Sequence, residues 1–152
     1  HDYISLMPTN LYGPGDNYDL KTSHVLPAMI RKFHEGKNNN KKVILWGSGE
    51  PLREFLHVDD LAQAIILKLS SESSNSIYNV GSSEEISIKN LAIKIQKIIG
   101  YKGEIIWDQS KPDGTPRKVL NSSFISQLGW KPKINLDEGI KMTYEDFLKI
   151  KN

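Results

Sequence analysis

The side chains best suited to exchange protons near neutral pH are the four histidines of this chain. His24 comes directly before residues 25–33, where apolar side chains recur every four positions and predict a helix. His24 therefore stands at the start of a helix, where it could act as a general acid or base. A structural role is the commoner alternative for a lone histidine. We interpret His34 as exposed helix surface and His57 as a packed strand residue.

Three further features could bind an anion or an aromatic ring. Arg53 follows a Gly-Ser-Gly-Glu-Pro-Leu turn, and its planar guanidinium would fit phosphate oxygens. It could equally form a surface ion pair with Glu50 or Glu54. Trp46 ends an apolar run, so a core position and a ligand-packing position are both open. The basic loop at residues 111–118 could bind a ligand or be a solvated connection.

Several kinds of site are excluded by what the sequence lacks. There is no cysteine, which rules out a disulfide, a zinc-thiolate site and a cysteine nucleophile within these residues. No glycine-rich G-x-G-x-x-G or P-loop pattern occurs, so the residues alone establish no dinucleotide site. No pair of histidines has the spacing of a helical metal site, and we expect no bound metal.

The composition indicates one compact domain without a strong electrostatic field. The chain has 152 residues, 38% of them hydrophobic, which fits one domain. Its 20 Lys plus Arg nearly balance 18 Asp plus Glu, so the net charge of +2 does not indicate a nucleic-acid partner. No apolar run reaches the roughly 20 residues that span a bilayer. We expect a soluble, cytoplasmic protein that binds no membrane.

Short apolar runs between turn residues predict the strands. We expect strands at residues 3–8, 43–46, 53–58, 77–81 and 104–107. The first should be buried and should lead into an irregular loop over residues 8–15, which holds two glycines and two prolines. A strand that ends in such a loop is a usual place for a ligand in an α/β protein.

Helical periodicity predicts helices between and after these strands. We expect Ser23, Asp59 and Ser87 to cap the first three, and Gly36 and Gly100 to end the first and third. The expected helices lie at residues 24–35, 60–69, 88–99, 122–128 and 135–150. The second should bury a broad apolar face made of Leu61, Ala62, Ile65, Ile66 and Leu69. Strands that alternate with helices indicate an α/β fold.

Five segments carry a resemblance to a known family. They are MPTNLYGP at 7–14, SHVLPA at 23–28, WGSG at 46–49, REFLHVDD at 53–60 and KPDGTPRK at 111–118. The first and fourth are typical of the extended short-chain dehydrogenase/reductases, the NAD-dependent epimerase/dehydratase family. The second and fifth resemble its GDP-L-fucose synthase branch. Together the five segments extend over nearly the whole chain.

This resemblance implies a fold and a place within a larger enzyme. Residues 1–152 would form a single α/β substrate-binding domain, the C-terminal part of an enzyme whose Rossmann-fold domain binds NAD(P). Residues 1–13 resemble the last Rossmann strand and its cofactor loop. The family's glycine-rich turn, Tyr-x-x-x-Lys pair and catalytic cysteine are absent. Since the chain also begins without methionine, we expect a fragment that is inactive when isolated.

The resemblance also implies a reaction. GDP-L-fucose synthases convert GDP-4-keto-6-deoxy-D-mannose to GDP-L-fucose by 3,5-epimerisation and NADPH-dependent reduction of the 4-keto group. Each epimerisation removes a proton beside the keto group and returns one to the opposite face. The motif makes His24 the catalytic acid/base and a neighbour of the cofactor. The cofactor NADP(H) would also contact Pro8, Thr9, Asn10 and Leu11.

The same resemblance implies substrate-binding residues and a homodimeric full-length protein. Arg53 would bind the diphosphate, Trp46 would pack on the nucleotide or its ribose, and Asp113 would accept hydrogen bonds from ribose hydroxyls. Lys32 matches a basic position near the substrate. Two alternatives stay open: the substrate domain of another sugar-nucleotide epimerase or dehydratase, or a non-catalytic nucleotide-binding module.

Overall fold

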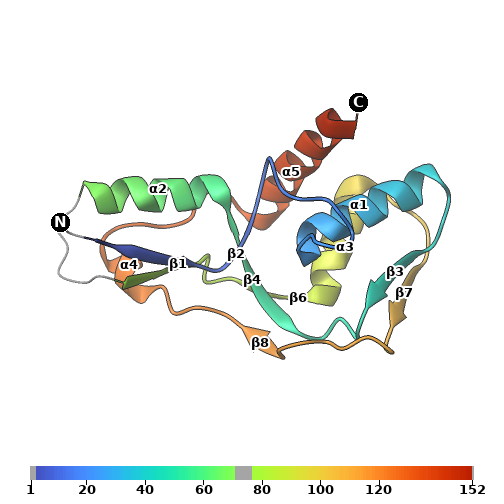
Figure 1. Cartoon of the computed structure of the whole chain (residues 1–152), viewed down its shortest axis with the longest axis horizontal. Helices are drawn as coiled ribbons and strands as arrows, with labels where there is room; N and C mark the ends of the chain where they lie inside the picture. Colours follow the sequence, from blue (N-terminus) through green and yellow to red (C-terminus); the bar gives the residue numbers. More distant parts are fainter. Residues whose placement is uncertain (1–2, 71–76, 152) are drawn as a thin grey trace.

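The computed structural model describes residues 3–70 and 77–151, and it confirms an α/β fold (Figure 1). No helix in these two ranges is long and apolar enough to cross a membrane. The strands are β1 (Ser5–Pro8), β2 (Asn10–Tyr12), β3 (Val43–Trp46), β4 (Leu52–His57), β5 (Ile77–Val80), β6 (Glu85–Ser87), β7 (Ile105–Asp108) and β8 (Arg117–Lys118). The helices are α1 (Val25–Asn38), α2 (Val58–Leu69), α3 (Ile88–Ile99), α4 (Ser123–Gln127) and α5 (Leu136–Lys151).

Parallel pairs of strands form the backbone of this fold. β1 pairs with β5, β2 with β4, and β3 with β7, all in parallel. β4 also pairs with antiparallel β6 and, at its start, with parallel β8. The long β4 therefore crosses the middle of the molecule and joins its two ends (Figure 1).

The prediction for the first strand is wrong in two respects. The chain does not pass from one strand into an irregular loop, because β2 follows β1 after a single residue, Thr9. Thr9 donates its N–H to Val80 O (3.0 Å) and its Oγ1 to Glu54 O (3.1 Å), so the chain changes partner strand at this residue. β1 is also not buried: it pairs only with β5 among the described residues, and Met7 is 54% exposed.

Two of the three predicted helix caps are also wrong. His24, not Ser23, is the N-cap of α1, and Ser23 Oγ is buried without a hydrogen-bond partner among the described residues. The cap of α2 is His57, whose Nδ1 accepts a hydrogen bond from Asp59 N (3.3 Å). Asp59 lies inside the first turn, where its negative charge favours the helix N-terminus.

The ends of α1 and α3 differ in how well the sequence indicates them. α1 does not end at Gly36 but continues to Asn38. Gly36 instead allows close packing, since a Cβ there would lie 2.7 Å from Val43 Cγ2. α3 follows the prediction fully. Ser87 Oγ accepts from Asn90 N (3.1 Å), and Gly100 ends the helix in the left-handed conformation at φ 72°.

The prediction for α2 is wrong about which side faces inward. Its buried residues are Asp60, Ala64 and Lys68, and Ile66 is 57% exposed. Asp60 is buried because its carboxylate accepts hydrogen bonds from two backbone N–H groups of the 133–134 segment (2.9 and 3.0 Å). The predicted apolar face is mostly exposed, with Leu61 partly buried and Ala62, Ile65, Ile66 and Leu69 exposed.

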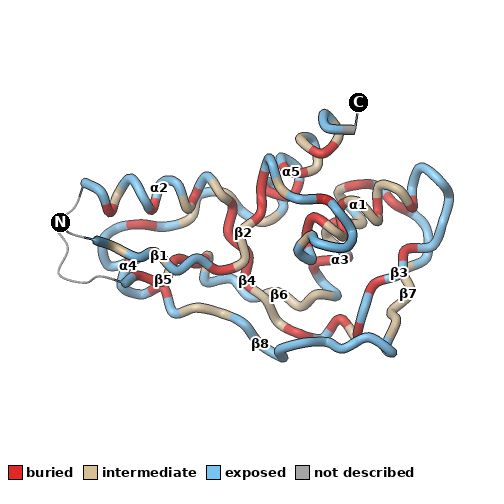
Figure 2. Tube along the Cα trace, viewed as in Figure 1, coloured by how far each residue is buried: buried red, intermediate tan, exposed pale blue. Residues whose placement is uncertain are grey.

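The buried side chains gather in two clusters, one on each side of β4 (Figure 2). The larger cluster lies among α1, α3, α5 and β3, and the smaller one lies beneath α2 and beside β5. The larger cluster comprises Tyr12, Tyr18, Leu26, Met29, Ile30, Phe33, Val43, Leu45, Phe55, Leu91, Ala92, Ile95, Ile99, Tyr101, Ile140 and Phe147. The smaller comprises Leu56, Ala64, Tyr78, Val80, Ile125 and Trp130.

Candidate functional site

The predicted cofactor stretch lies where β1 passes into β2. Pro8 is exposed at the end of β1, Thr9 is buried, and Asn10 and Leu11 are partly buried. Asn10 Nδ2 donates to Glu54 O (2.8 Å), the same carbonyl that accepts from Thr9 Oγ1. These bonds place the stretch beside the residue that follows Arg53.

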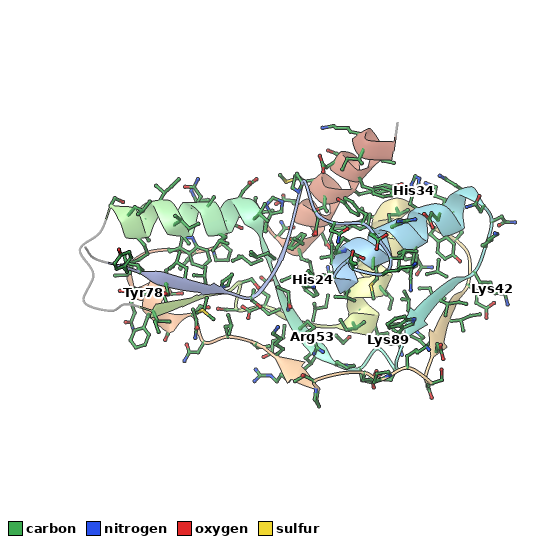
Figure 3. The ribbon with its side chains drawn as sticks, in the orientation of Figure 1. His24, His34, Lys42, Arg53, Tyr78 and Lys89 are labelled. Atoms are coloured by element: carbon green, nitrogen blue, oxygen red, sulfur yellow. The ribbon has the colours of Figure 1, made fainter. Side chains whose placement is uncertain are left out.

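His24 is exposed at the N-terminus of α1 (Figure 3). Its backbone is extended (φ −72°, ψ 168°), its carbonyl accepts from Ala28 N (3.0 Å), and its side chain makes no cap hydrogen bond. The imidazole is therefore free to act on a ligand instead of holding the helix. Burial raises the pKa of the Asp16 carboxyl in the loop before α1, whereas a hydrogen bond from Asn17 N and the charge of His24 act to lower it.

A cavity of about 190 Å³ brings together three predicted substrate residues, Trp46, Arg53 and Asp113. The residue after His24, Val25, also lines it, so the cavity lies beside the histidine. Its remaining lining residues are Gly49, Pro51, Ile88 and Pro112. Residues from four separate segments of the chain thus meet at one place.

Arg53 is held by backbone carbonyls and not by an acidic side chain. Its Nη1 donates to Leu52 O (2.8 Å) and to Thr115 O (2.6 Å). Among the described residues it forms no ion pair with Glu50 or Glu54, so the surface ion-pair alternative is not realised here. The guanidinium keeps its positive charge unneutralised next to the cavity.

Trp46 is 64% exposed, so the alternative that it is a core residue is wrong. The Nζ atoms of Lys32 and Lys111 lie 5.8 and 5.9 Å from its ring centroid, within reach of cation–π attraction. Lys32 also donates to Ile44 O (2.9 Å), and burial lowers the pKa of its amine. Lys32 lines a neighbouring cavity of about 460 Å³, which shares Trp46 with the first.

Asp113 fixes the basic loop to the turn after β3. Its two carboxylate oxygens accept from Ser48 N (2.6 Å) and Ser48 Oγ (2.7 Å), which lower the pKa of the carboxyl. Gly47, at φ 78°, leaves room for this contact, because a Cβ there would overlap Asp113 Oδ1. Asp113 thus has a structural partner, and its oxygens have lone pairs left for a ligand hydroxyl.

Sequence reasoning missed two groups near this site. Glu54 is fully buried, and its carboxylate accepts from Ser83 N (2.7 Å) and Leu120 N (2.9 Å). Asp16 lies in the loop before α1. Asp16 has no local sequence signal. For Glu54 the signal is a glutamate within the predicted strand at 53–58, where a buried carboxylate must be hydrogen-bonded.

A larger cavity, about 720 Å³, lies elsewhere, between β4, β6, α3 and the start of α5. It contains none of the predicted site residues. Both signs of charge line it, and an ion pair joins Lys94 to Asp137 across it (2.8 Å). The described residues contain no group of three or more metal-binding side chains.

Comparisons with known proteins agree on one family. The model of the NAD dependent epimerase/dehydratase family matches residues 1–81. The chain is 51% identical to GDP-L-fucose synthase 1 of Arabidopsis thaliana and 49% identical to the GDP-L-fucose synthase of Escherichia coli strain K12, each over 97% of the chain. It spans 46% and 49% of the length of these relatives, about half.

A solved structure shows the same fold. It is a GDP-L-fucose synthetase from Naegleria fowleri bound to NADP, with 31% identity and a TM-score of 0.90. The match extends over 96% of this chain and 46% of that chain. With a parallel α/β fold, a matching family model over more than half of its residues and relatives of this kind, the chain belongs to the NAD dependent epimerase/dehydratase family.

Proposed function

We propose that this chain is the substrate-binding part of a GDP-L-fucose synthase, which converts GDP-4-keto-6-deoxy-D-mannose to GDP-L-fucose with NADPH. One observation carries the proposal: a single cavity is lined by Trp46, Arg53 and Asp113 and lies next to His24. The similarity to enzymes of this name over 97% of the chain supports it.

The cavity supplies the groups that a nucleoside diphosphate needs. The unneutralised Arg53 guanidinium offers planar donors to the diphosphate oxygens. The exposed Trp46 ring offers a flat apolar surface to the base or ribose, with two lysines beside it to add positive charge. Binding the diphosphate here would place the attached sugar within reach of a nearby acid or base.

His24 is the group suited to proton exchange on that sugar. In each epimerisation a base removes the proton at C3 or C5, the electron pair moves toward the C4 oxygen, and a proton returns from the opposite face. His24 would serve one face of the ring. A second group must serve the other, and the resemblance assigns that role to a cysteine that is absent from this sequence.

The residues at the end of β1 fit the nicotinamide end of NADP(H). Pro8 is exposed there, and Thr9 and Asn10 are fixed by their bonds to Glu54 O, so the strand end is both open and rigid. The carboxyl ends of parallel strands are where dinucleotides bind in α/β proteins. When bound, the cofactor would supply the hydride that reduces C4. Pro8, Thr9, Asn10 and Leu11 would hold its ring.

The chain would act within a longer protein. The curated relatives are about twice as long, and the parallel β1–β5 pair has exposed residues although parallel sheets are normally covered on both faces. We infer that β1, β5 and the outer face of α2 adjoin the cofactor domain. A homodimer and a cytoplasmic location stay predictions from the resemblance.

Two measurements test this function. A protein that joins this chain to a complete cofactor domain should oxidise NADPH with GDP-4-keto-6-deoxy-D-mannose and release GDP-L-fucose. The chain alone should show no such oxidation. Calorimetric competition among GDP-, UDP- and dTDP-sugars should favour the GDP sugar, and a preference for UDP or dTDP would contradict the assignment and favour another enzyme of the family.

A further inference from the structure

One wall of the cavity that contains Arg53 is an exposed loop. Residues 109–118 are exposed throughout, and Pro112 and Asp113 of this loop line the cavity. Ordering such a loop costs conformational entropy, and without apolar burial hydrogen bonds have to offset that cost. The shape of the cavity therefore depends on the hydrogen bonds that hold the loop.

Two attachments join the middle and the end of this loop to other elements. At its end, β8 pairs with the start of β4, and Leu52 N donates to Pro116 O (2.8 Å). In its middle, the two carboxylate oxygens of Asp113 accept from Ser48 N (2.6 Å) and Ser48 Oγ (2.7 Å). Thr115 lies between these two attachments, so both determine where its carbonyl points.

Ser48 is well placed to hold a carboxylate. It lies in the turn after β3, and its N–H and its hydroxyl each bond one oxygen of Asp113. Its Oγ also accepts from Glu50 N (3.1 Å), so the hydroxyl hydrogen is left to point to the carboxylate. The bond from Ser48 N, followed by that from its hydroxyl, lowers the pKa of Asp113. The carboxyl is therefore charged at neutral pH, and both bonds are charge-assisted.

The loop supplies a carbonyl that orients Arg53, which lies on β4 beside it (Figure 3). Arg53 Nη1 donates to Leu52 O (2.8 Å) and to Thr115 O (2.6 Å), so both of its hydrogens are in use. Leu52 O belongs to the preceding residue and moves with Arg53, whereas Thr115 O belongs to the loop. The direction of the guanidinium therefore depends on where the loop is held.

The side of the guanidinium that suits a phosphate is left open. Within residues 3–70 and 77–151, Nε and Nη2 of Arg53 form no hydrogen bond. Their N–H groups make up the fork that binds two oxygens of one phosphate. Because the two carbonyls fix Nη1, this fork is presented in one direction before a ligand arrives. A displaced loop would release Nη1, and binding would then have to order the side chain as well.

We propose that Ser48 is a positioning residue for nucleotide binding: it holds Asp113 and thereby fixes the direction of Arg53. The loop between them transmits the effect through Thr115 O. The choice of a nucleoside diphosphate as the ligand rests on the proposed function. The attachment of the loop by Ser48 requires no ligand. Ser48 acts through Asp113 and does not touch the nucleotide.

Amide hydrogen exchange in this chain tests the attachment. The Leu52 amide reports on the loop, because it donates to a loop carbonyl. Ser48→Ala removes one of the two bonds to Asp113, so exchange at Leu52 should become about fivefold faster or more. Ser110→Ala is the matched control, since Ser110 Oγ also donates to an aspartate, Asp108 Oδ1 (2.6 Å), but only two residues away. It should leave exchange at Leu52 unchanged. An unchanged rate in Ser48→Ala, or an equal rise in both variants, would overturn the proposal.

Calorimetry with GDP and kinetics in the longer protein test the consequence. Ser48→Ala should weaken GDP binding about threefold to tenfold and raise KM for the GDP sugar to match. The turnover number kcat should stay unchanged, because the diphosphate contacts are the same before and during the reaction. Ser48→Thr keeps the hydroxyl and should restore most of the affinity, and Ser110→Ala should behave as the wild type.

Faster exchange at Leu52 combined with wild-type GDP affinity in Ser48→Ala would contradict the positioning role. A wild-type longer protein that does not bind GDP would instead overturn the proposed function. Exchange at Leu52 would still decide whether Ser48 holds the loop, since that measurement uses no nucleotide.

Discussion

The two ends of the molecule differ in how completely their helices are covered. At the end formed by α1, α3 and α5, each helix packs its apolar side into the larger cluster, and this end carries the cavity with Trp46 and Arg53. At the end formed by α2, β1 and β5, the apolar side of α2 faces outward. The comparison suggests that the nucleotide cavity stands on a self-sufficient core, whereas the other end is completed by further protein.

The largest effect should come from emptying the well-covered core. Ile95→Ala on α3 removes a side chain that is 0% exposed and leaves a cavity, which should lower the free energy of unfolding by about 2 to 5 kcal/mol. Ile93→Ala on the same helix is the control, since Ile93 is 50% exposed and should lose less than about 1 kcal/mol. Urea unfolding measures both. Equal losses would contradict the burial of Ile95 in the larger cluster.

A smaller effect should follow from Glu54, which connects the two ends. Its carboxylate accepts from Ser83 N and Leu120 N, and Glu54→Gln would turn an amide N–H₂ toward one of these donors. We expect a loss of about 1.5 to 3 kcal/mol of unfolding free energy. Glu50→Gln, at an exposed residue of the nearby turn, should cost almost nothing. A wild-type melting curve for Glu54→Gln would show that these two hydrogen bonds to its carboxylate do not stabilise the fold.

Arg53→Lys tests the cavity itself. Lysine keeps the charge but loses the planar fork, so binding of GDP-L-fucose to the longer protein should weaken by about 1 to 3 kcal/mol. Arg117→Lys is a suitable control, because Arg117 pairs with Glu85 and does not line this cavity. Calorimetry with both variants separates a loss of diphosphate binding at Arg53 from a general effect of replacing an arginine by lysine. Unchanged affinity would remove Arg53 from the site.

The sequence predicts those parts of the fold that depend on local signals. α3 combines an apolar period with Ser87 at its start and Gly100 at its end, and all three features are confirmed. β2 has only three residues within a glycine- and proline-rich segment, so its pairing with β4 is decided by the tertiary structure. For α2, Asp60 turns inward because distant backbone N–H groups bind it, which no local pattern shows.

The candidate site also combines features that local sequence signals predict with features that only the tertiary structure decides. His24 is placed at the start of α1 by an apolar period that the sequence shows directly. Trp46, Arg53 and Asp113 are brought together by strand pairing and by the Asp113–Ser48 contacts, which join residues 65 positions apart. Only the family resemblance grouped these three residues in advance.

The smallest effect on the isolated chain should come from the exposed side of α2. Ile66→Gln replaces a side chain that is 57% exposed by a good helix former, so the unfolding free energy should change by less than about 0.5 kcal/mol. If further protein covers this side, the same variant should cost about 1.5 kcal/mol or more in the longer protein, because a polar amide would then be buried. Gln63→Ala, at an exposed polar residue of the same helix, should be neutral in both proteins. Urea unfolding of the chain and of the longer protein measures the difference, and equal small effects in both would mean that α2 stays exposed and that the cofactor domain adjoins another surface.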